Sequence, residues 1–288
     1  MMCFKQVLDS LMSQGNCMIR IHDEVKLRLT LPFYVLNTPA LVERRDHALS
    51  QLRRHGAADI TIVHCANRED IVELPPLKVH CLHPRMAPTV YAKAQPELVA
   101  GTLSLAVKHT IAMYDVLRRH LRCGAILEDD AFLHPRFGIE LNSYLPDIPV
   151  DAAVFYLGSY SRIHGTFRQG HRDQGWPQVP NTHPNTTLYM RNNSGGILGG
   201  IGYIIFERGA RAIVRPIVAP ADIMISHQLE PIGAPGPTYG SADYLVWPAP
   251  YLQGKKGGSH YVDSKGRATL GSGKLLSSGN RNTTNAVG

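Results

Sequence analysis

Residues 125–133 of the chain read Ala-Ile-Leu-Glu-Asp-Asp-Ala-Phe-Leu, an acidic run held between two apolar runs. The pattern predicts a buried strand over residues 125–127 that ends in Glu128, Asp129 and Asp130. In α/β sheets ligands bind beyond the carboxyl ends of the strands, where this run falls. A solvated acidic turn is the simpler interpretation, but the apolar runs on both sides disfavour it.

Three adjacent carboxylates at such a place repel one another. Two unit charges about 4 Å apart repel by roughly 4 kcal/mol at the intermediate dielectric of a protein surface. A bound cation lowers this cost, and Mg²⁺ or Mn²⁺ prefers hard oxygen ligands and commonly completes its octahedron with waters and substrate phosphates. The run therefore predicts a half-site for a divalent cation that bridges a diphosphate.

Strand and helix patterns alternate on both sides of the acidic run and predict an α/β fold. The strand patterns lie at residues 31–37, 59–65, 125–127, 153–157, 203–206 and 247–252, and the helical patterns at residues 39–56, 97–121 and 208–218. The strand–helix–strand order at the start implies a parallel pair joined by a crossover helix. We expect a mostly parallel central sheet flanked by helices.

Composition narrows the class of partner. The formal net charge of +7 favours an anionic partner. The basic residues are scattered and no nucleic-acid-binding motif accompanies them, so we expect no nucleic acid but a phosphate-bearing small molecule. Five cysteines form no Cys-x-x-Cys pair and are odd in number, which argues against a disulfide framework and a structural zinc site. A reduced, cytoplasmic compartment is the expectation.

Several segments, the acidic run among them, are similar to the motifs of one protein family and occur in the same order. They are Tyr-Val-Leu-Asn at 34–37 with Glu-Arg-Arg at 43–45, Gly-Thr-Leu-Ser-Leu-Ala-Val-Lys-His at 101–109, Ala-Ile-Leu-Glu-Asp-Asp at 125–130, Gly-Tyr-Ile-Ile-Phe-Glu-Arg-Gly-Ala at 202–210 with Pro-Ala-Asp at 220–222, and Trp-Pro-Ala-Pro at 247–250 with Gln253. Across roughly residues 31 to 256 the chain thus resembles glycosyltransferase family 25, which includes lipooligosaccharide and procollagen galactosyltransferases. The ordered set is more specific than the acidic run alone.

The resemblance implies a fold of GT-A type, a Rossmann-like sheet that binds a nucleotide-sugar together with a divalent cation, Mn²⁺ or Mg²⁺. It also implies an inverting transfer of a sugar, such as galactose from a UDP-linked donor, to a hydroxyl of a glycan or glycoconjugate acceptor. The chain departs from the family at four places. Arginines are usual where Ala40 and Leu41 stand, Cys65-Ala-Asn67 replaces the family's Ala-x-Asp-Gly, and Lys108 replaces a serine before His109. These departures leave the donor open.

The expected roles follow the motifs. The donor-binding candidates are Asn37, Arg44, Arg45, His109, Glu128, Asp129, Lys255 and Lys256, and the metal-binding candidates are Asp130, Glu128 and His260. We expect Arg45 to point toward the sheet and Arg44 to be solvated. His109 lies on an apolar helix face, where a core histidine and a donor-site residue are equal alternatives. Asp222 is the candidate general base, or else a helix N-cap, and Asp243 is the reserve.

Three functions stay open at this point. The first is the inverting, metal-dependent hexosyltransferase. A metal-dependent phosphoesterase or nucleotidyltransferase also uses clustered carboxylates but attacks phosphorus. The third is a non-catalytic glycan-binding protein on a degenerate transferase scaffold, which the missing arginines and Cys65-Ala-Asn67 suggest.

We expect residues 1–30 to form an N-terminal extension, residues 31–262 the glycosyltransferase domain, and residues 263–288 a flexible tail rich in Gly, Ser and Asn. The N-terminus carries charged residues and no apolar stretch, so it predicts neither a signal peptide nor a transmembrane segment.

Overall fold

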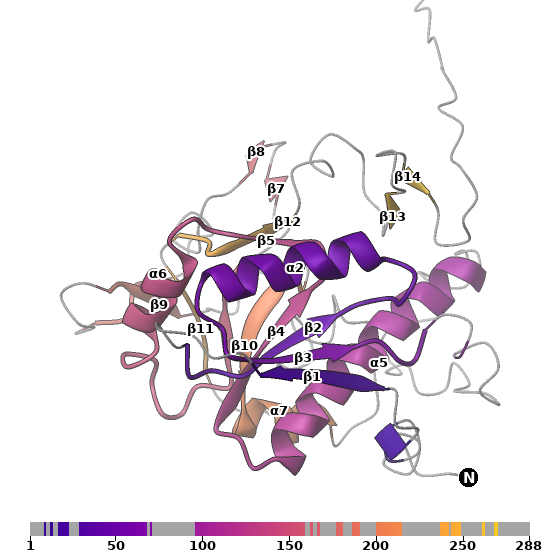
Figure 1. Ribbon diagram of the computed structural model, residues 1–288. Coiled ribbons are helices and arrows are strands. Elements are labelled where there is room, and N and C mark those ends of the chain that lie inside the picture. The colour runs from indigo at the N-terminus through magenta and orange to yellow at the C-terminus, as the bar shows by residue number, and fades with distance from the viewer. Residues whose placement is uncertain are drawn as a thin grey trace, which may run out of the picture.

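The chain was analysed as a computed structural model (Figure 1). The structure describes residues 9, 12–13, 17–22, 29–67, 70, 96–158, 162–163, 166–167, 177–180, 186–190, 200–214, 237–241, 243–248, 261–262 and 268–269. In these ranges, no helix is long and apolar enough to cross a membrane.

An eight-stranded sheet forms the centre of the described fold, in the order β1-β3-β2-β4-β10-β6-β11-β9. Its strands are β1 (Met18–His22), β2 (Phe33–Leu36), β3 (Asp59–Val63), β4 (Cys123–Glu128), β6 (Val154–Tyr156), β9 (Leu188–Met190), β10 (Gly202–Phe206) and β11 (Thr238–Ser241). Three small sheets pair β5 (Ala131–Leu133) with β12 (Val246–Pro248), β7 (Arg162–Ile163) with β8 (Thr166–Phe167), and β13 (Tyr261–Val262) with β14 (Ala268–Thr269). The described helices are α2 (Val42–Arg54), α5 (Pro96–Arg118), α6 (Phe137–Tyr144) and α7 (Glu207–Val214).

The predicted α/β class is confirmed, but the prediction of a mostly parallel sheet is wrong. Strands β3, β2 and β4 run parallel as neighbours, and so do β6 and β11. The remaining neighbours, β1–β3, β4–β10, β10–β6 and β11–β9, are antiparallel. Buried strands of a mixed sheet carry the same continuous apolar runs as buried parallel strands, so the sequence pattern did not distinguish them.

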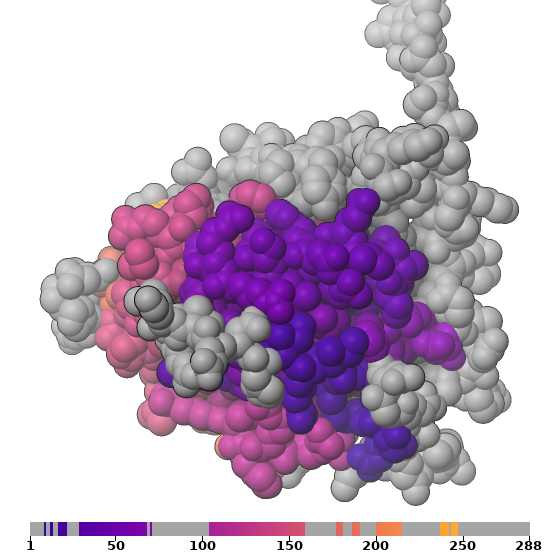
Figure 2. All heavy atoms as spheres, viewed as in Figure 1, coloured from indigo at the N-terminus to yellow at the C-terminus, as the bar shows by residue number. Residues whose placement is uncertain are grey.

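Helices cover both faces of the sheet and form a three-layer arrangement. Ala48, Leu49 and Leu52 of α2 pack in one core cluster, together with residues of α6 and one face of β2 and β3. Residues of α5 and α7 pack in a second cluster on the other face. The face in Figure 2 shows the purple segment that contains α2 over much of its area. The sheet is therefore buried on both sides, and its edges and strand ends are left for binding.

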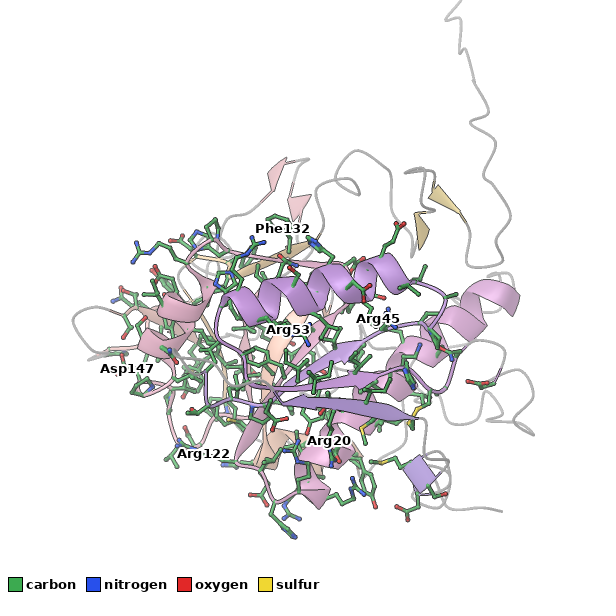
Figure 3. The ribbon with its side chains drawn as sticks, in the orientation of Figure 1. Arg20, Arg45, Arg53, Arg122, Phe132 and Asp147 are labelled. Atoms are coloured by element: carbon green, nitrogen blue, oxygen red, sulfur yellow. A yellow bond between two sulfur atoms is a disulfide. The ribbon has the colours of Figure 1, made fainter. Side chains whose placement is uncertain are left out.

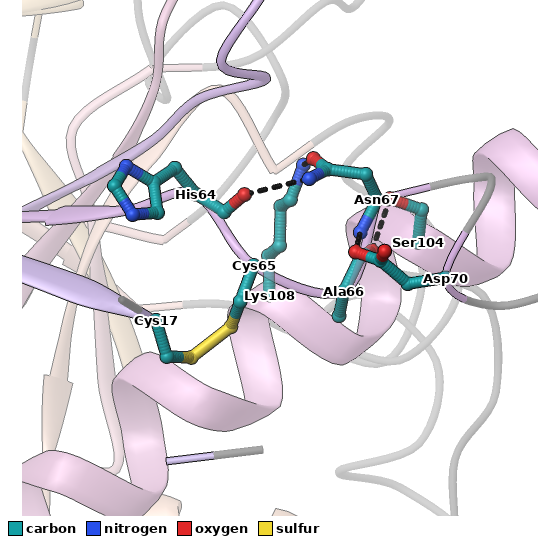
Figure 4. The surroundings of a disulfide bond; sticks show 8 residues. All are labelled: Cys17, His64, Cys65, Ala66, Asn67, Asp70, Ser104 and Lys108. Carbon is teal, nitrogen blue, oxygen red and sulfur yellow. Dashed lines mark hydrogen bonds between the residues drawn. A yellow bond between two sulfur atoms is a disulfide. The ribbon is translucent and has the colours of Figure 1, made fainter. Parts of the chain in front are cut away.

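The expected N-terminal extension contributes a strand to the sheet. Strand β1 pairs with β3 along its whole length and forms one edge of the sheet. A disulfide joins Cys17, directly before β1, to Cys65, two residues after the end of β3 (Figure 4). The cysteine count argued against a disulfide framework, but this pair forms one bridge, so the count no longer argues for a reduced compartment. The odd cysteine number did not exclude one bridge; Cys123 is the free cysteine in the described part of the chain.

A buried carboxylate fastens β1 and α5 to the sheet. Asp115 of α5 is fully buried and accepts hydrogen bonds from Arg20 of β1 at 3.0 and 3.2 Å and from the Tyr34 hydroxyl of β2 at 2.9 Å. Arg118 also contacts Asp115 at 2.8 Å. Figure 3 shows Arg20 at the lower side of the sheet. Burial, the first cause, and the neighbouring Asp115 raise the pKa of Tyr34 well above its ordinary range, so its hydroxyl stays a donor.

We predict that Asp115→Asn lowers the free energy of unfolding by about 3 kcal/mol, because removal of one partner from a buried ionic network leaves the others uncompensated. Urea denaturation measures the change. Asp46→Asn is the matched control, since the Asp46 carboxylate is exposed and pairs only with a surface arginine in the described contacts. The control is expected to change stability by less than about 1 kcal/mol. Equal effects of the two substitutions would contradict this assignment.

Candidate functional site

The carboxyl ends of β2 and β4 meet at one edge of the sheet. In the parallel pairing Leu36 lies opposite Glu128, so the residues that follow each strand, Asn37 and Asp129, are neighbours. The backbone N–H of Asp129 donates to the carbonyl of Leu36 at 3.2 Å. The predicted position of the acidic run at a strand end is therefore confirmed.

The two aspartates after β4 share one arginine. Nη2 of Arg44, on the first turn of α2, lies 2.9 Å from Oδ1 of Asp129 and 2.6 Å from Oδ2 of Asp130. All three side chains are largely buried, with exposed fractions of 14%, 9% and 11% respectively. Asp129 and Asp130 thus form a compact ion-paired cluster with Arg44, not a solvated turn.

The prediction that Arg45 points toward the sheet and Arg44 into solvent is wrong. Arg45 pairs with its neighbour Asp46 at 2.9 Å and its side chain is about one-third exposed. The physical reason is Gln51, two turns after Arg44, which donates to the carbonyl of Ala131 and accepts from the N–H of Leu133. The side of α2 that carries Gln51 therefore faces β5 and the acidic run, and Arg44 lies on the same side.

Asn37 lies between the acidic run and α2. Its Nδ2 donates to Oδ2 of Asp129 at 2.8 Å and to the carbonyl of Leu41 at 3.2 Å. The residue is 2% exposed, and its Oδ1 accepts no hydrogen bond from the described residues. A buried acceptor without a donor costs about 1–3 kcal/mol, so it indicates a place where a ligand supplies the donor.

Lys108 of α5 supplies a second cation, which sequence analysis noted only as a departure from the family. Its Nζ donates to Oδ1 of Asn67 at 2.9 Å (Figure 4) and to the Thr38 hydroxyl at 3.3 Å. The residue is 3% exposed. The signal in the sequence was a lone lysine within an apolar helical stretch, because a buried lysine requires polar partners.

Burial makes the Asp129 carboxylate costly to ionise. The pKa of Asp129 is raised to about 6: burial, the largest cause, and the neighbouring charge of Asp130 raise it, whereas Arg44, Asn37 and Lys108 lower it. The carboxylate needs these cations in order to stay ionised near neutral pH.

Glu128 lies on the other side of the sheet from Asp130. Its Oε1 is 4.0 Å from Nε2 of His109 on α5, whose Nδ1 lies 2.8 Å from the Tyr203 hydroxyl. Successive side chains point to opposite faces of a strand, which separates Glu128 from Asp129, and the turn that follows β4 brings Asp130 to Arg44 on the α2 side as well. The prediction that both ligate one ion does not agree with this arrangement. His109 is fully buried, which agrees with the core-histidine alternative, and its role in donor binding stays a prediction.

Burial alone lowers the pKa of His109 from its ordinary 6.5 to about 3. Below about pH 6.5 His109 therefore binds a proton in the unfolded chain but stays neutral in the folded chain. The free energy of unfolding is therefore unaffected by His109 above about pH 6.5. As the pH falls from there toward 3, it decreases by about 1.4 kcal/mol per pH unit.

We predict that His109→Gln shows a flatter decline of unfolding free energy between pH 6.5 and 4.5 than the wild type. Urea denaturation at a series of pH values measures it, with the exposed His47→Gln as the control expected to retain the wild-type slope. Equal slopes for wild type and His109→Gln would show that this histidine is not held neutral by the fold.

The described side chains do not fit a resident divalent cation in this arrangement. Mn²⁺ or Mg²⁺ needs octahedral oxygen ligands at about 2.1 Å. The carboxylates of Asp129 and Asp130 already contact Arg44. In the described part of the chain, no three His, Cys, Asp or Glu side chains are grouped so that they could hold a metal ion. Cation binding stays a prediction.

The remaining candidates are not brought to this cluster by the described structure. Asp243 is exposed between β11 and β12, where its backbone carbonyl accepts a hydrogen bond from the Ser241 hydroxyl. Its role as a reserve base stays a prediction. Asp222, Lys255, Lys256 and His260 lie outside the described residues.

Comparison with known proteins does not assign the chain to a family. No protein-family model matches it, and no curated protein matches it either. The functional argument therefore depends on the site and on the ordered motifs.

Proposed function

We propose that the chain is a glycosyltransferase that transfers a sugar from a nucleoside diphosphate donor, UDP-linked, to a hydroxyl of a glycan or glycoconjugate. The proposal includes the finer fold, of GT-A type. The parallel strands β3, β2 and β4 with their candidate residues at the carboxyl edge support it, since this edge is where α/β sheets bind ligands.

One observation carries the proposal. The buried Oδ1 of Asn37 has no donor among the described residues and lies beside a cluster that contains both Arg44 and Lys108. A hydroxyl or N–H of a nucleotide offers the missing donor, and the guanidinium and ammonium groups are the side chains that proteins use for phosphates. A nucleoside diphosphate combines these two features.

The reaction is a displacement at the anomeric carbon. The acceptor oxygen forms the new bond to that carbon, the bond between carbon and the diphosphate oxygen breaks, and the nucleoside diphosphate leaves with the electron pair. A base takes the proton of the acceptor hydroxyl. Within the described residues, Asp129 and Asp130 hold Arg44 in place, and positively charged side chains stabilise the charge that grows on the leaving oxygen.

An exposed aromatic ring beside the cluster supports a glycan acceptor. Phe132, two residues after Asp130, is 37% exposed and stacks on His47, with ring centroids 5.9 Å apart. Figure 3 shows Phe132 above α2. The apolar C–H face of a sugar ring that packs on such a ring removes apolar surface from water.

A non-catalytic glycan-binding protein is the second candidate. The contact of Arg44 with both carboxylates favours it, because those carboxylates would otherwise be the ligands of the predicted cation. The two candidates differ in turnover: only the transferase releases free nucleoside diphosphate together with a glycoside. Release of phosphate or nucleoside monophosphate instead would indicate the phosphoesterase class.

We predict that Asp130→Asn reduces turnover by about a hundredfold, because loss of one carboxylate misplaces Arg44 and the donor. The measurement is release of UDP from UDP-hexoses in the presence of a panel of glycan acceptors. Glu140→Gln is the control, since Glu140 on α6 makes a surface ion pair with Arg136, the residue before this helix. Unchanged turnover in Asp130→Asn would remove the acidic run from the active site.

A further inference from the structure

We propose that Arg44 and Lys108 supply the positive charge that a divalent cation was expected to supply, so that this site binds a nucleoside diphosphate without a metal ion. The inference rests on the proposed function and states which cofactor the proposed enzyme requires. It runs against the sequence-based expectation of Mn²⁺ or Mg²⁺.

The first argument is the position of Arg44. A divalent ion ligated by both aspartates would lie next to Nη2 of Arg44, which contacts one oxygen of each carboxylate, at 2.9 and 2.6 Å. At about 4 Å, a divalent ion and a guanidinium repel by roughly 8 kcal/mol at the dielectric of a protein surface. Arg44 and the ion therefore compete for one place.

The second argument is the charge of the site. Since Glu128 lies on the α5 side beside His109, the carboxylates at the site are those of Asp129 and Asp130. Arg44 contacts both, and Nζ of Lys108 donates to the hydroxyl of Thr38, the residue after Asn37, whose Nδ2 donates to Asp129. The two cations therefore balance the two largely buried aspartates without an added ion.

The third argument is that two departures from the family pattern contact each other. Asn67 stands where the family has Asp, which removes one negative charge, and Lys108 stands where it has Ser, which adds one positive charge. Together they shift the local charge by two, as much as one divalent cation. Nζ of Lys108 and Oδ1 of Asn67 lie 2.9 Å apart, so the two changes form one unit.

The fourth argument is that this unit is held rigidly. Ala66, before Asn67, has a left-handed backbone with φ of 54°, and its carbonyl accepts a hydrogen bond from the Ser104 hydroxyl at 2.7 Å. Nδ2 of Asn67 donates to the carbonyl of His64 at 2.9 Å. The cation is therefore fixed before a ligand binds, which reduces the reorganisation that binding requires.

The test is isothermal titration of the full chain with UDP, GDP and ADP, each in EDTA and again in excess Mn²⁺. We expect at least one nucleotide to bind with a dissociation constant that differs by less than about twofold between the two conditions. Binding that disappears in EDTA and returns with Mn²⁺ would overturn this inference and leave the proposed function standing. Absence of binding under both conditions would overturn the proposed function itself.

A substitution of Arg44 gives a second test of the inference. Arg44→Gln is expected to bind the same nucleotide about tenfold more weakly in EDTA and to regain affinity with Mn²⁺, because the ion then occupies the place of the guanidinium. Arg54→Gln is the matched control, an exposed arginine at the end of the same helix, and is expected to bind as the wild type does. If Arg44→Gln misfolds, as circular dichroism would show, the wild-type comparison in EDTA and Mn²⁺ alone decides the inference. Undiminished binding by folded Arg44→Gln in EDTA would overturn it.

Discussion

The structure at this edge of the sheet depends on one constraint: two carboxylates that are largely buried at the end of β4 must be compensated by positive charge. Arg44 meets this requirement by contact with both Asp129 and Asp130. The pairing ties the first turn of α2 to β4, while Gln51 ties its later part to β5. The helix is thereby aligned along the acidic run, and the neighbouring Asn37 is left with an acceptor that no described residue satisfies.

The same requirement explains why positively charged groups from two helices gather at this end of the strands. Ionic groups at low exposure are unfavourable unless each finds a partner, so the sequence must provide cations from two different helices, α2 and α5. The two helices cover opposite faces of the sheet, and their cations converge only where the strands end. A ligand at this edge would contact side chains from both layers.

Much of the local structure could be predicted from the sequence, because it follows from apolar periodicity and turn chemistry. The strands near Tyr34 and Ile126 and the helix that ends before Gly56 are confirmed, and Gly56 has the positive φ of 86° that a helix end of this kind favours. Strand direction could not be predicted, since β10 is as apolar as a parallel strand although it runs antiparallel to both neighbours. Strand β1 was missed because, as an edge strand, it alternates polar and apolar residues over only a short length.

The sequence predicted where the candidate site lies, but not which side chains contact one another there. A consecutive acidic run is visible in the sequence, whereas the choice between Arg44 and Arg45 depended on Gln51, a polar residue that an apolar stripe leaves out. Lys108 and Asn67 are 41 positions apart, so only the fold reveals that they form one unit. Long-range pairing of polar side chains is the information that periodicity does not contain.

The most direct measurement is a crystal structure of the chain soaked with UDP and Mn²⁺. The account predicts that the diphosphate lies at the carboxyl ends of β2 and β4, within hydrogen-bond distance of Arg44 or Lys108, with Arg44 still between the two aspartates. A Mn²⁺ ion bound by Asp130 with Arg44 turned away, or a nucleotide bound far from this edge, would contradict it.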